Sequence, residues 1–381
     1  MTAIERRAIT IVPSASDRLC QNFAVINRTA KIILILGFCL RLNAQTQPAN
    51  TNTLPSSQTF TNPLLPSGAD PWVIYRDGYY YYMNTTGNDL TIWKTRNIAD
   101  LKNADKKVVW TPPPTGPDSH EIWAPELHFL SGKWYIYFAA DAGKNETHRL
   151  FVLENSSPDP LTGDWVFKGK LADSSDKWAI DPTVFEEHGK AYVVWSGWEG
   201  DENGTQSIFI AQLKNPWTIK GKRAKLSSSQ YPWEKVGDLP DGNPPHVDVN
   251  EGPEILEHDD KVFLIYSASG CWTDYYELGM LTASAKSNPL KPASWKKAPR
   301  PVFWESPDAR VYGTGHNAFF KSPDGKQDWI LYHANSAPHQ GCGTFRSPRA
   351  QPFGWNPDGT PNFGRPIPLD TPIPRPSGEQ Q

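Results

Sequence analysis

The sequence predicts an all-β protein, a five-bladed β-propeller, and three observations support this prediction. One hairpin pattern occurs five times, its copies recur about every sixty residues, and no stretch has the apolar spacing of an amphipathic helix. About sixty residues hold four short strands with their loops, which is the size of one propeller blade. An antiparallel β-sandwich also repeats hairpins, usually at closer and less regular intervals, and it is the alternative.

Each hairpin begins with a polar residue and Pro, continues as an apolar strand and returns as a strand rich in aromatic residues. Asp-Gly and Ser-Gly turns between the strands supply the positive φ that tight hairpins require. In chain order the hairpins begin with the strands 69–75, 123–129, 178–185, 251–256 and 315–320. Aligning Pro71, Pro125, Pro182, Pro253 and Asn317 gives spacings of 54, 57, 71 and 64 residues. Short apolar runs after each hairpin are expected to complete the blades.

The longest spacing separates the third and fourth hairpins. Residues 199–249 contain clusters of Gly, Asn and Pro, including Asp238-Leu239-Pro240-Asp241-Gly242-Asn243-Pro244-Pro245. We therefore expect this insertion to be a loop, and long loops on a rigid scaffold often have a function.

The beginning of the chain has the features of an export signal. Residues 32–40 are apolar, follow Arg28 and Lys31, and precede a small residue, Ala44, suited to cleavage. Nine apolar residues are too few to span a membrane. Residues 1–31 are long for the charged part of a signal peptide, so we suspect a misassigned start.

These features predict four segments and a secreted or periplasmic protein. The segments are a signal peptide (1–44), a flexible leader (45–61), the propeller catalytic domain (62–375) and a tail (376–381). The net charge of −3 gives no indication of binding to nucleic acid. Cleavage would leave Cys271 and Cys342, which either pair between adjacent blades or remain as two buried thiols.

The repeats differ most at the residue before the aligned Pro or Asn. This residue is Asp70, Ala124, Asp181, Gly252 or His316, and Glu251 stands one place earlier in the fourth repeat. Because the first strand of each blade lines the propeller axis, the three acids are expected to meet in one cavity. Converging carboxylates are typical of glycoside hydrolysis, and close negative charges raise each other's pKa. A single Asp before Pro is often only structural, but three acids in register favour catalysis.

These motifs resemble glycoside hydrolase family 43. The resemblance rests on Ala69-Asp70-Pro71-Trp72-Val73, Ile180-Asp181-Pro182 and Asn250-Glu251-Gly252-Pro253-Glu254, with further likeness at Trp123-Ala124-Pro125-Glu126, Gly315-His316-Asn317 and residues 346–351. It implies a five-bladed propeller and an inverting mechanism. Asp70 would be the general base and Glu251 the general acid, while Asp181 would orient Glu251 and raise its pKa.

The resemblance also suggests binding residues. His316 would lie on the axis near a bound calcium ion or water, so it is either a metal ligand or a neutral hydrogen-bonded histidine. Trp123 would stack on a sugar ring or pack in the core. Arg346 would bind sugar hydroxyls or form a surface ion pair, and Arg349 competes for the same role. One structural calcium ion and no organic cofactor are expected.

The expected activity is release of terminal α-L-arabinofuranosyl residues from arabinan or arabinoxylan, which are plant cell-wall polysaccharides. Within the family, residues 269–274 and 341–343 look most similar to α-L-arabinofuranosidases. A β-xylosidase or an endo-arabinanase would use the same three acids. From another class, the chain could be a non-catalytic carbohydrate-binding propeller, and a structural or partner-binding propeller would not need the acids in register.

Overall fold

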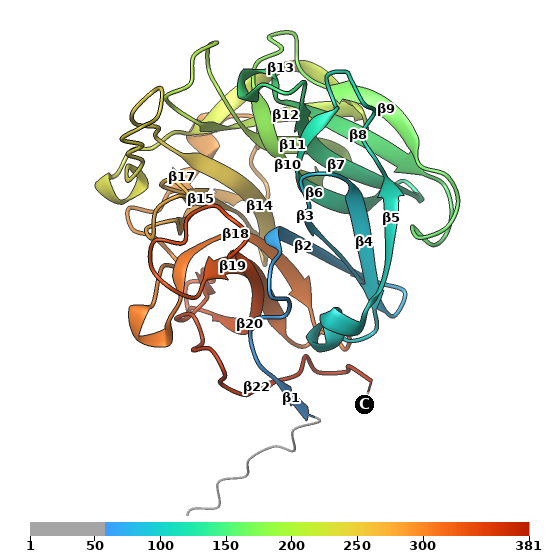
Figure 1. Ribbon diagram of the computed structural model, residues 1–381, viewed down its shortest axis with the longest axis vertical. Helices are drawn as coiled ribbons and strands as arrows, with labels where there is room; N and C mark the ends of the chain where they lie inside the picture. Colours follow the sequence, from blue (N-terminus) through green and yellow to red (C-terminus); the bar gives the residue numbers. More distant parts are fainter. Residues whose placement is uncertain (1–57, 381) are drawn as a thin grey trace, which may run out of the picture. The chain divides into compact units, whose positions relative to one another are not determined.

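The computed structural model describes residues 58–380, in which five four-stranded antiparallel sheets are arranged around a common centre. Each sheet uses four consecutive strands, so each blade is one continuous piece of chain (Figure 1). The predicted five-bladed propeller is therefore confirmed. The predicted signal peptide, residues 1–44, lies outside the described residues.

In each blade the strands follow one another outward from the centre of the propeller. Blade 1 contains β2 (Ala69–Arg76), β3 (Tyr79–Thr85), β4 (Leu90–Thr95) and β5 (Asp105–Trp110), and blade 2 contains β6 (His120–Leu130), β7 (Lys133–Asp141), β8 (Arg149–Asn155) and β9 (Val166–Leu171). Blade 3 contains β10 (Ala179–Glu187), β11 (Lys190–Gly197), β12 (Ser207–Asn215) and β13 (Thr218–Ser227). Blade 4 contains β14 (Asn250–His258), β15 (Lys261–Ala268), β16 (Glu277–Ser284) and β17 (Lys296–Lys297), and blade 5 contains β18 (Tyr312–Lys321), β19 (Asp328–Asn335), β20 (Ser347–Trp355) and β21 (Pro361–Asn362).

Helical structure among the described residues is limited to short 3₁₀ turns. These are η2 (Ile98–Asn103), η3 (Asn145–Thr147), η4 (Pro232–Glu234), η5 (Pro292–Ser294) and η6 (Pro307–Ala309). None of the helices in residues 58–380 is long and apolar enough to cross a bilayer.

The prediction for the long insertion was partly wrong. Residues 199–249 were expected to be a loop apart from a short outer strand at 208–213, which is confirmed as β12, but they also contain the whole of β13, and the long loop begins only at residue 228. The segment Thr218–Ser227 alternates Lys and Arg with less polar residues, and it pairs with β12 as the outer edge of blade 3. Charged side chains suit such an edge because they discourage pairing with another chain.

Apolar side chains fill the spaces between neighbouring blades. The β-branched and aromatic residues of the two inner strands face the adjacent sheets. Examples are Val193, Val194 and Trp195 of β11, which are nearly inaccessible to solvent. The ring closes between blades 1 and 5, where Tyr80 packs edge-on against Phe320 with centroids 5.5 Å apart.

A segment before blade 1 reinforces this closure, and we call residues 59–68 the closing strap. Its strand β1 (Thr59–Phe60) pairs with β22 (Ile373–Pro374) near the end of the chain (Figure 1). Asn62 exchanges two hydrogen bonds of 3.0 Å with the backbone of Ala350 in blade 5. The leader was predicted to be flexible as far as residue 61, but these backbone groups find partners, so ordered structure begins earlier.

The predicted tail also packs on the propeller. The Glu379 carboxylate accepts a 2.7 Å hydrogen bond from the backbone N–H of Ile98, and the Asn97 amide donates to the carbonyl of Gln380 at 2.8 Å. The last described residues therefore lie against blade 1.

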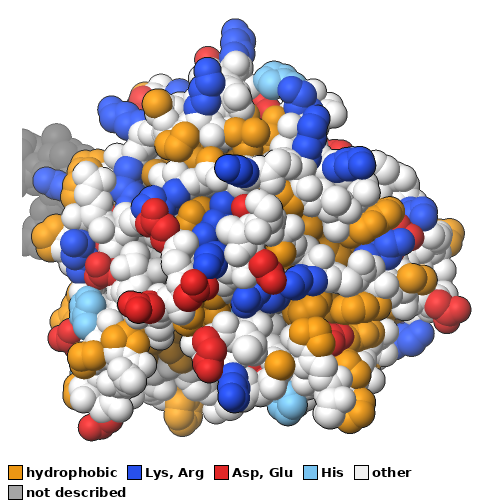
Figure 2. All heavy atoms as spheres, turned by 90° about the horizontal axis from the view of Figure 1, so that it is seen from above, with side chains coloured by type: hydrophobic (Ala, Val, Ile, Leu, Met, Phe, Trp, Pro, Cys, Tyr) orange, Lys and Arg blue, Asp and Glu red, His pale blue; other side chains and the backbone are white. Residues whose placement is uncertain are grey.

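The face of the molecule in Figure 2 shows Lys and Arg side chains intermixed with Asp and Glu. This distribution agrees with the small net charge and gives no basic surface suited to a polyanion on that face.

Candidate active site

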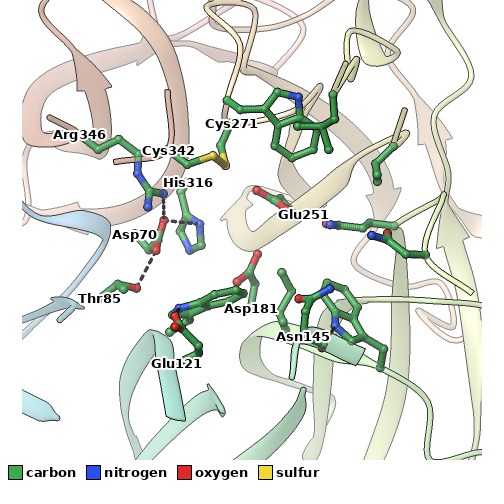
Figure 3. Close-up of a pocket in the computed structure, with 18 residues that line it drawn as sticks. Asp70, Thr85, Glu121, Asn145, Asp181, Glu251, Cys271, His316, Cys342 and Arg346 are labelled. Atoms are coloured by element: carbon green, nitrogen blue, oxygen red, sulfur yellow. Dashed lines mark hydrogen bonds and ion pairs between the residues drawn. A yellow bond between two sulfur atoms is a disulfide. The ribbon is translucent and has the colours of Figure 1, made fainter. Parts of the chain in front are cut away.

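A cavity of about 420 Å³ lies where the five innermost strands begin. This volume is within the range of small-molecule binding sites. Six of the residues that the sequence singled out line it, and all but Trp123 are labelled in Figure 3: Asp70, Trp123, Asp181, Glu251, His316 and Arg346. These side chains come from strands or loops of all five blades, so the repeats do converge at the axis.

A shared backbone distortion directs these side chains. The five equivalent residues all have positive φ, at 54° for Asp70, 43° for Ala124, 54° for Asp181, 51° for Gly252 and 47° for His316. The strand register shifts at each of them. A bulge of this kind bends a strand and re-aims a side chain, and positive φ in non-Gly residues stores strain that is common at functional sites.

In the fourth blade the acid, Glu251, precedes the bulge position by one residue, and the space around Gly252 explains why. A Cβ atom on Gly252 would lie 3.1 Å from Nδ1 of His316, closer than side chains ordinarily approach. The bulge position therefore has little room for a side chain, and Glu251 supplies the carboxyl group instead.

Asp70 is a carboxylate surrounded by donors. Arg346 Nη1 donates to its Oδ1 at 2.9 Å, and the hydroxyl of Thr85 donates to its Oδ2 at 2.6 Å (Figure 3). Nδ1 of His316 lies 3.3 Å from the same Oδ1. Burial opposes ionisation, but the neighbouring charges, with Arg346 foremost, and the Thr85 hydrogen bond together hold the pKa of Asp70 well below its usual range.

Asp181 and Glu251 have the opposite electrostatic setting. Burial, followed by the charges of Glu251 and Asp70, raises the pKa of Asp181 well above its usual value. Burial, followed by the charge of Asp70 against a lowering hydrogen bond from Tyr276, raises the pKa of Glu251 to about 7. The backbone N–H of Gly252 donates to Asp181 at 3.0 Å, and the Tyr276 hydroxyl donates to Glu251 at 2.8 Å. The surroundings of Asp181 and Glu251 therefore favour the protonated form, whereas those of Asp70 favour the ionised form.

Trp123 lies at the wall of the cavity rather than in the core. One face of its indole stacks on His148, with centroids 4.1 Å apart, and its Nε1–H donates to Glu121 at 2.9 Å. A second indole, Trp178, also lines the cavity and stacks on Trp198 behind it. Each ring is held on one face by its neighbour; Trp123 is partly exposed, whereas only 3% of Trp178 is exposed.

The structure separates the two candidate arginines. Arg346 lines the cavity and pairs with Asp70. Arg349 is fully buried, and its guanidinium donates to the Ser336 hydroxyl at 2.9 Å, away from the cavity lining. Arg346 is thus the arginine of the site. It does form an ion pair, but with Asp70 in the cavity and not at the surface, as one alternative had predicted.

The predicted calcium ion would need a set of oxygen ligands around His316. Calcium takes six to eight oxygen ligands. Within residues 58–380, no group of three or more His, Cys, Asp or Glu side chains is arranged to hold a metal ion, and the nearest carboxylate, Asp70, is already bonded to Arg346 and Thr85. The protein side chains do not fit a calcium site by themselves, so no step below depends on one.

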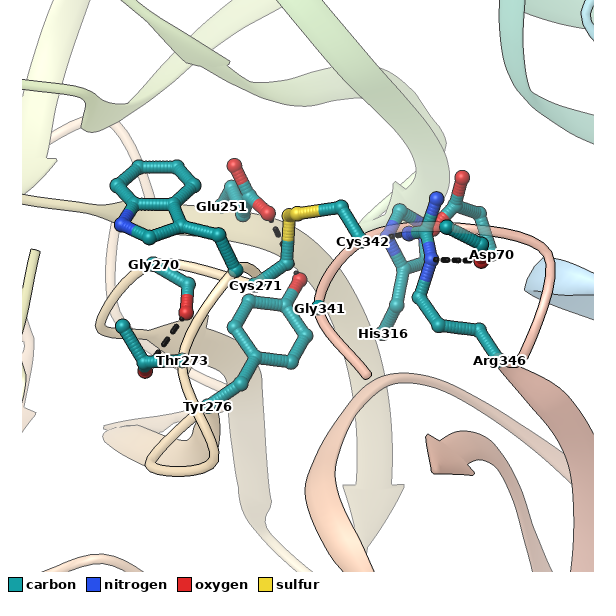
Figure 4. Close-up of a disulfide and its surroundings, with 12 residues drawn as sticks. Asp70, Glu251, Gly270, Cys271, Thr273, Tyr276, His316, Gly341, Cys342 and Arg346 are labelled. Carbon is teal, nitrogen blue, oxygen red and sulfur yellow. Dashed lines mark hydrogen bonds and ion pairs between the residues drawn. A yellow bond between two sulfur atoms is a disulfide. The ribbon is translucent and has the colours of Figure 1, made fainter. Parts of the chain in front are cut away.

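Cys271 and Cys342 form a disulfide, with Cα atoms 5.2 Å apart. It joins the loop after β15 in blade 4 to the loop after β19 in blade 5, so the paired alternative is the correct one. Both cysteines line the cavity (Figure 4).

Several site residues were not predicted from the sequence. Thr85 and His333 contact Asp70, Tyr276 contacts Glu251, and Trp178 and Trp272 line the cavity. Trp178 opens the third hairpin and could have been found by comparison with Trp123. Thr85, Tyr276 and Trp272 lie at strand ends or in loops, and His333 lies within β19, positions that no repeat marks.

Comparison with known proteins places the chain among carbohydrate-active enzymes. Residues 60–361 match the family described as Glycosyl hydrolases family 43. An extracellular exo-α-(1→5)-L-arabinofuranosidase of Streptomyces avermitilis is 38% identical over 349 residues, which are 89% of this chain and 70% of that protein. A protein of the same name from Streptomyces chartreusis is 37% identical and covers 75% of this chain and 86% of its own length. The crystal structure of an α-L-arabinofuranosidase from Lactobacillus brevis is 37% identical, with a TM-score of 0.75 over 82% of this chain and 98% of that chain.

Proposed function

The chain belongs to glycoside hydrolase family 43, and on this premise we propose that it is a secreted inverting enzyme that releases terminal α-L-arabinofuranosyl residues from arabinan or arabinoxylan. The observation that carries the mechanism is the contrast between one ionised carboxylate, Asp70, and one proton-retaining pair, Asp181 and Glu251, in the same cavity.

Glu251 is the proposed general acid. A group whose pKa is about 7 can both hold a proton and release it near neutral pH, which suits acid catalysis. The carboxyl of Asp181, whose pKa is raised much further, gives up its proton less readily. Asp181 is therefore assigned the task of orienting Glu251, and the charge of Glu251 in turn raises the pKa of Asp181.

Asp70 is the proposed general base. It accepts the proton of a water molecule as the water oxygen bonds to the anomeric carbon. At the same time Glu251 protonates the glycosidic oxygen, the bond between that oxygen and the anomeric carbon breaks, and the leaving sugar departs as an alcohol. One water is consumed, and the configuration at the anomeric carbon is inverted.

The remaining cavity residues are assigned to substrate binding. Trp123 presents an indole whose other face is fixed by His148, as expected for stacking on a sugar ring. Arg346 is held by Asp70 and has further N–H groups that could reach a sugar hydroxyl. A calcium ion near His316 stays a prediction.

The choice of an arabinofuranoside rests on the relatives. Two of them, at 37% and 38% identity, are named as extracellular exo-acting α-L-arabinofuranosidases. Export of this chain is further supported by the apolar stretch at residues 32–40 and by the disulfide, since disulfides persist in oxidising compartments.

The test is hydrolysis of aryl α-L-arabinofuranoside and aryl β-D-xyloside by the purified protein, with the anomer of the released sugar followed by NMR. We expect turnover of the arabinofuranoside and an inverted first product. Turnover of the xyloside alone would favour the β-xylosidase alternative. Binding of arabinan without hydrolysis of either substrate would favour the non-catalytic propeller.

A further inference from the structure

One side of the cavity is formed by loops rather than by blade strands, and we call this region the pinned wall. It consists of the insertion loop (228–249), the loop after β15 (269–276) and the loop after β19 (336–346). Its residues that line the cavity are Leu239, Val247, Cys271, Trp272, Cys342 and Arg346.

Several cross-links hold the pinned wall together. The disulfide joins the second loop to the third. The backbone N–H of Gly270 donates to the carbonyl of Val236 at 2.8 Å, which joins the second loop to the insertion loop. The backbone N–H of His339 donates to Asp274 at 2.8 Å, which joins the third loop to the second again.

Within this wall, the indole of Trp272 is fixed on two sides. Its Nε1–H donates to the carbonyl of Asp238 at 3.0 Å. A Cβ atom on Gly270 would lie 2.2 to 2.7 Å from three carbon atoms of the indole, so the ring packs directly on the Gly270 backbone. The disulfide anchors the preceding residue, Cys271. Because the ring is held before any ligand arrives, a ligand would bind it at a small entropic cost.

The position of the wall relates Trp272 to the two proposed catalytic groups. Figures 3 and 4 show the Cys271 end of the disulfide beside Glu251 and the Cys342 end toward Arg346, Asp70 and His316. Trp272 follows Cys271 and is bonded to the insertion loop, which connects blade 3 to the strand that carries Glu251. Trp272 therefore lies on the side of the proposed acid.

We propose that Trp272 stacks on the leaving-group sugar, the residue to which the terminal arabinofuranosyl unit is attached. In an inverting reaction the acid stands at the leaving group and the base stands on the opposite face of the reacting sugar. The single polar atom of the indole is already bonded to Asp238, so the ring offers an apolar face to the C–H groups of a sugar. This inference rests on the proposed function and adds the residue that selects the leaving group.

The experiment compares Trp272→Ala with the unmodified protein on two substrates. α-1,5-Arabinobiose has a sugar as its leaving group, whereas methyl α-L-arabinofuranoside has only a methyl group there. We expect kcat/KM for arabinobiose to fall about tenfold or more, mainly through KM, as is common when one buried aromatic contact is removed from a binding site. The kcat/KM for the methyl glycoside should change little.

A second variant keeps the tryptophan and moves its ring. Gly270→Ala places a methyl group where the indole now lies, so it should reproduce the selective loss on arabinobiose. Gly354→Ala is the matched control, because a Cβ atom there meets no atom within 4 Å.

Three results would overturn the proposal. These are an equal loss on both substrates in the folded variants, no loss on arabinobiose, and a loss confined to the methyl glycoside. Failure of the unmodified protein to hydrolyse either substrate would instead refute the proposed function on which this inference rests, so the two failures are distinguishable.

Discussion

Asp70 and Asp181 are the same residue type at equivalent positions of blades 1 and 3, and each has a φ of 54°. They are also similarly buried, with 9% and 6% of their surface exposed. Nevertheless, the pKa of Asp70 is lowered and that of Asp181 is raised. The backbone and the motif are shared, so the difference comes from the neighbours. Asp70 has Arg346 and Thr85, whereas Asp181 faces another acid, Glu251.

The repeat thus sets where a carboxyl group lies, and the neighbouring side chains, from the same blade or from others, set whether it carries a proton. Predictions that alter the neighbours should therefore change the protonation of one acid and leave the fold intact.

The largest effect on activity is expected when the ionised carboxylate, Asp70, is replaced. Asp70→Asn should lower kcat about a hundredfold to ten-thousandfold with every leaving group, because the water loses its general base. Asp77→Asn is the matched control, since Asp77 is an exposed turn residue with a φ of 51°. A folded Asp70→Asn protein with full activity would show that the base is another residue.

The next largest effect on activity is expected at Glu251, the proposed general acid, and its size depends on the leaving group of the substrate. Glu251→Gln should lower kcat/KM about a hundredfold or more on arabinobiose, whose leaving oxygen needs a proton. The loss should be much smaller on 4-nitrophenyl α-L-arabinofuranoside, because nitrophenolate departs without one. Equal losses on these two substrates would argue against Glu251 as the acid.

A smaller effect is expected when the cation beside Asp70 is removed. Arg346→Met takes away the charge that favours the ionised carboxylate, so the pKa of Asp70 should rise. Activity needs Asp70 without its proton, so the acidic limb of the pH profile should move to higher pH. Arg310→Met, at an exposed ion pair with Asp370, is the control and should leave that limb in place. An unmoved acidic limb in Arg346→Met would mean that the charge of Arg346 does not set the ionisation of Asp70.

The smallest effect is expected at the hydroxyl that contacts Glu251. The hydrogen bond from Tyr276 lowers the pKa of Glu251, so Tyr276→Phe should raise this pKa from about 7. Activity needs the proton on Glu251 and is lost as pH rises through its pKa. The alkaline limb should therefore move to higher pH in Tyr276→Phe, and its neighbour Tyr275, which is exposed, provides the control Tyr275→Phe. A shift to lower pH would contradict the assignment.

Much of the fold could be predicted from the sequence because each blade is a local unit. The hairpin turns, the alternation of apolar residues and the position before each aligned Pro lie within short stretches, and these placed Asp70, Asp181 and Glu251 in one cavity. The strand Thr218–Ser227 was missed because its Lys and Arg residues obscure the apolar pattern of an edge strand.

Contacts between distant segments could not be predicted in the same way. Tyr276 reaches Glu251 from a loop, and His333 reaches Asp70 from the middle of blade 5. Trp272 can be recognised as a cavity residue only in the structure, where the disulfide and the insertion loop hold it in place. Arg346 could be selected over Arg349 only in the structure, because Arg346 lies just before β20 and is partly exposed, whereas Arg349 lies within the strand and is fully buried.

The closing strap has a consequence for the synthesis of the protein. The backbone N–H of Gly68 donates to the carbonyl of Arg346 at 2.9 Å, and Asp70 follows two residues later. The carboxylate therefore leaves the ribosome early, while the arginine beside it is among the last parts to be made. Until blade 5 is complete, Asp70 has no cation and the ring is open. A chain that ends before Arg346 would therefore lack the ion pair that favours the ionised form of Asp70.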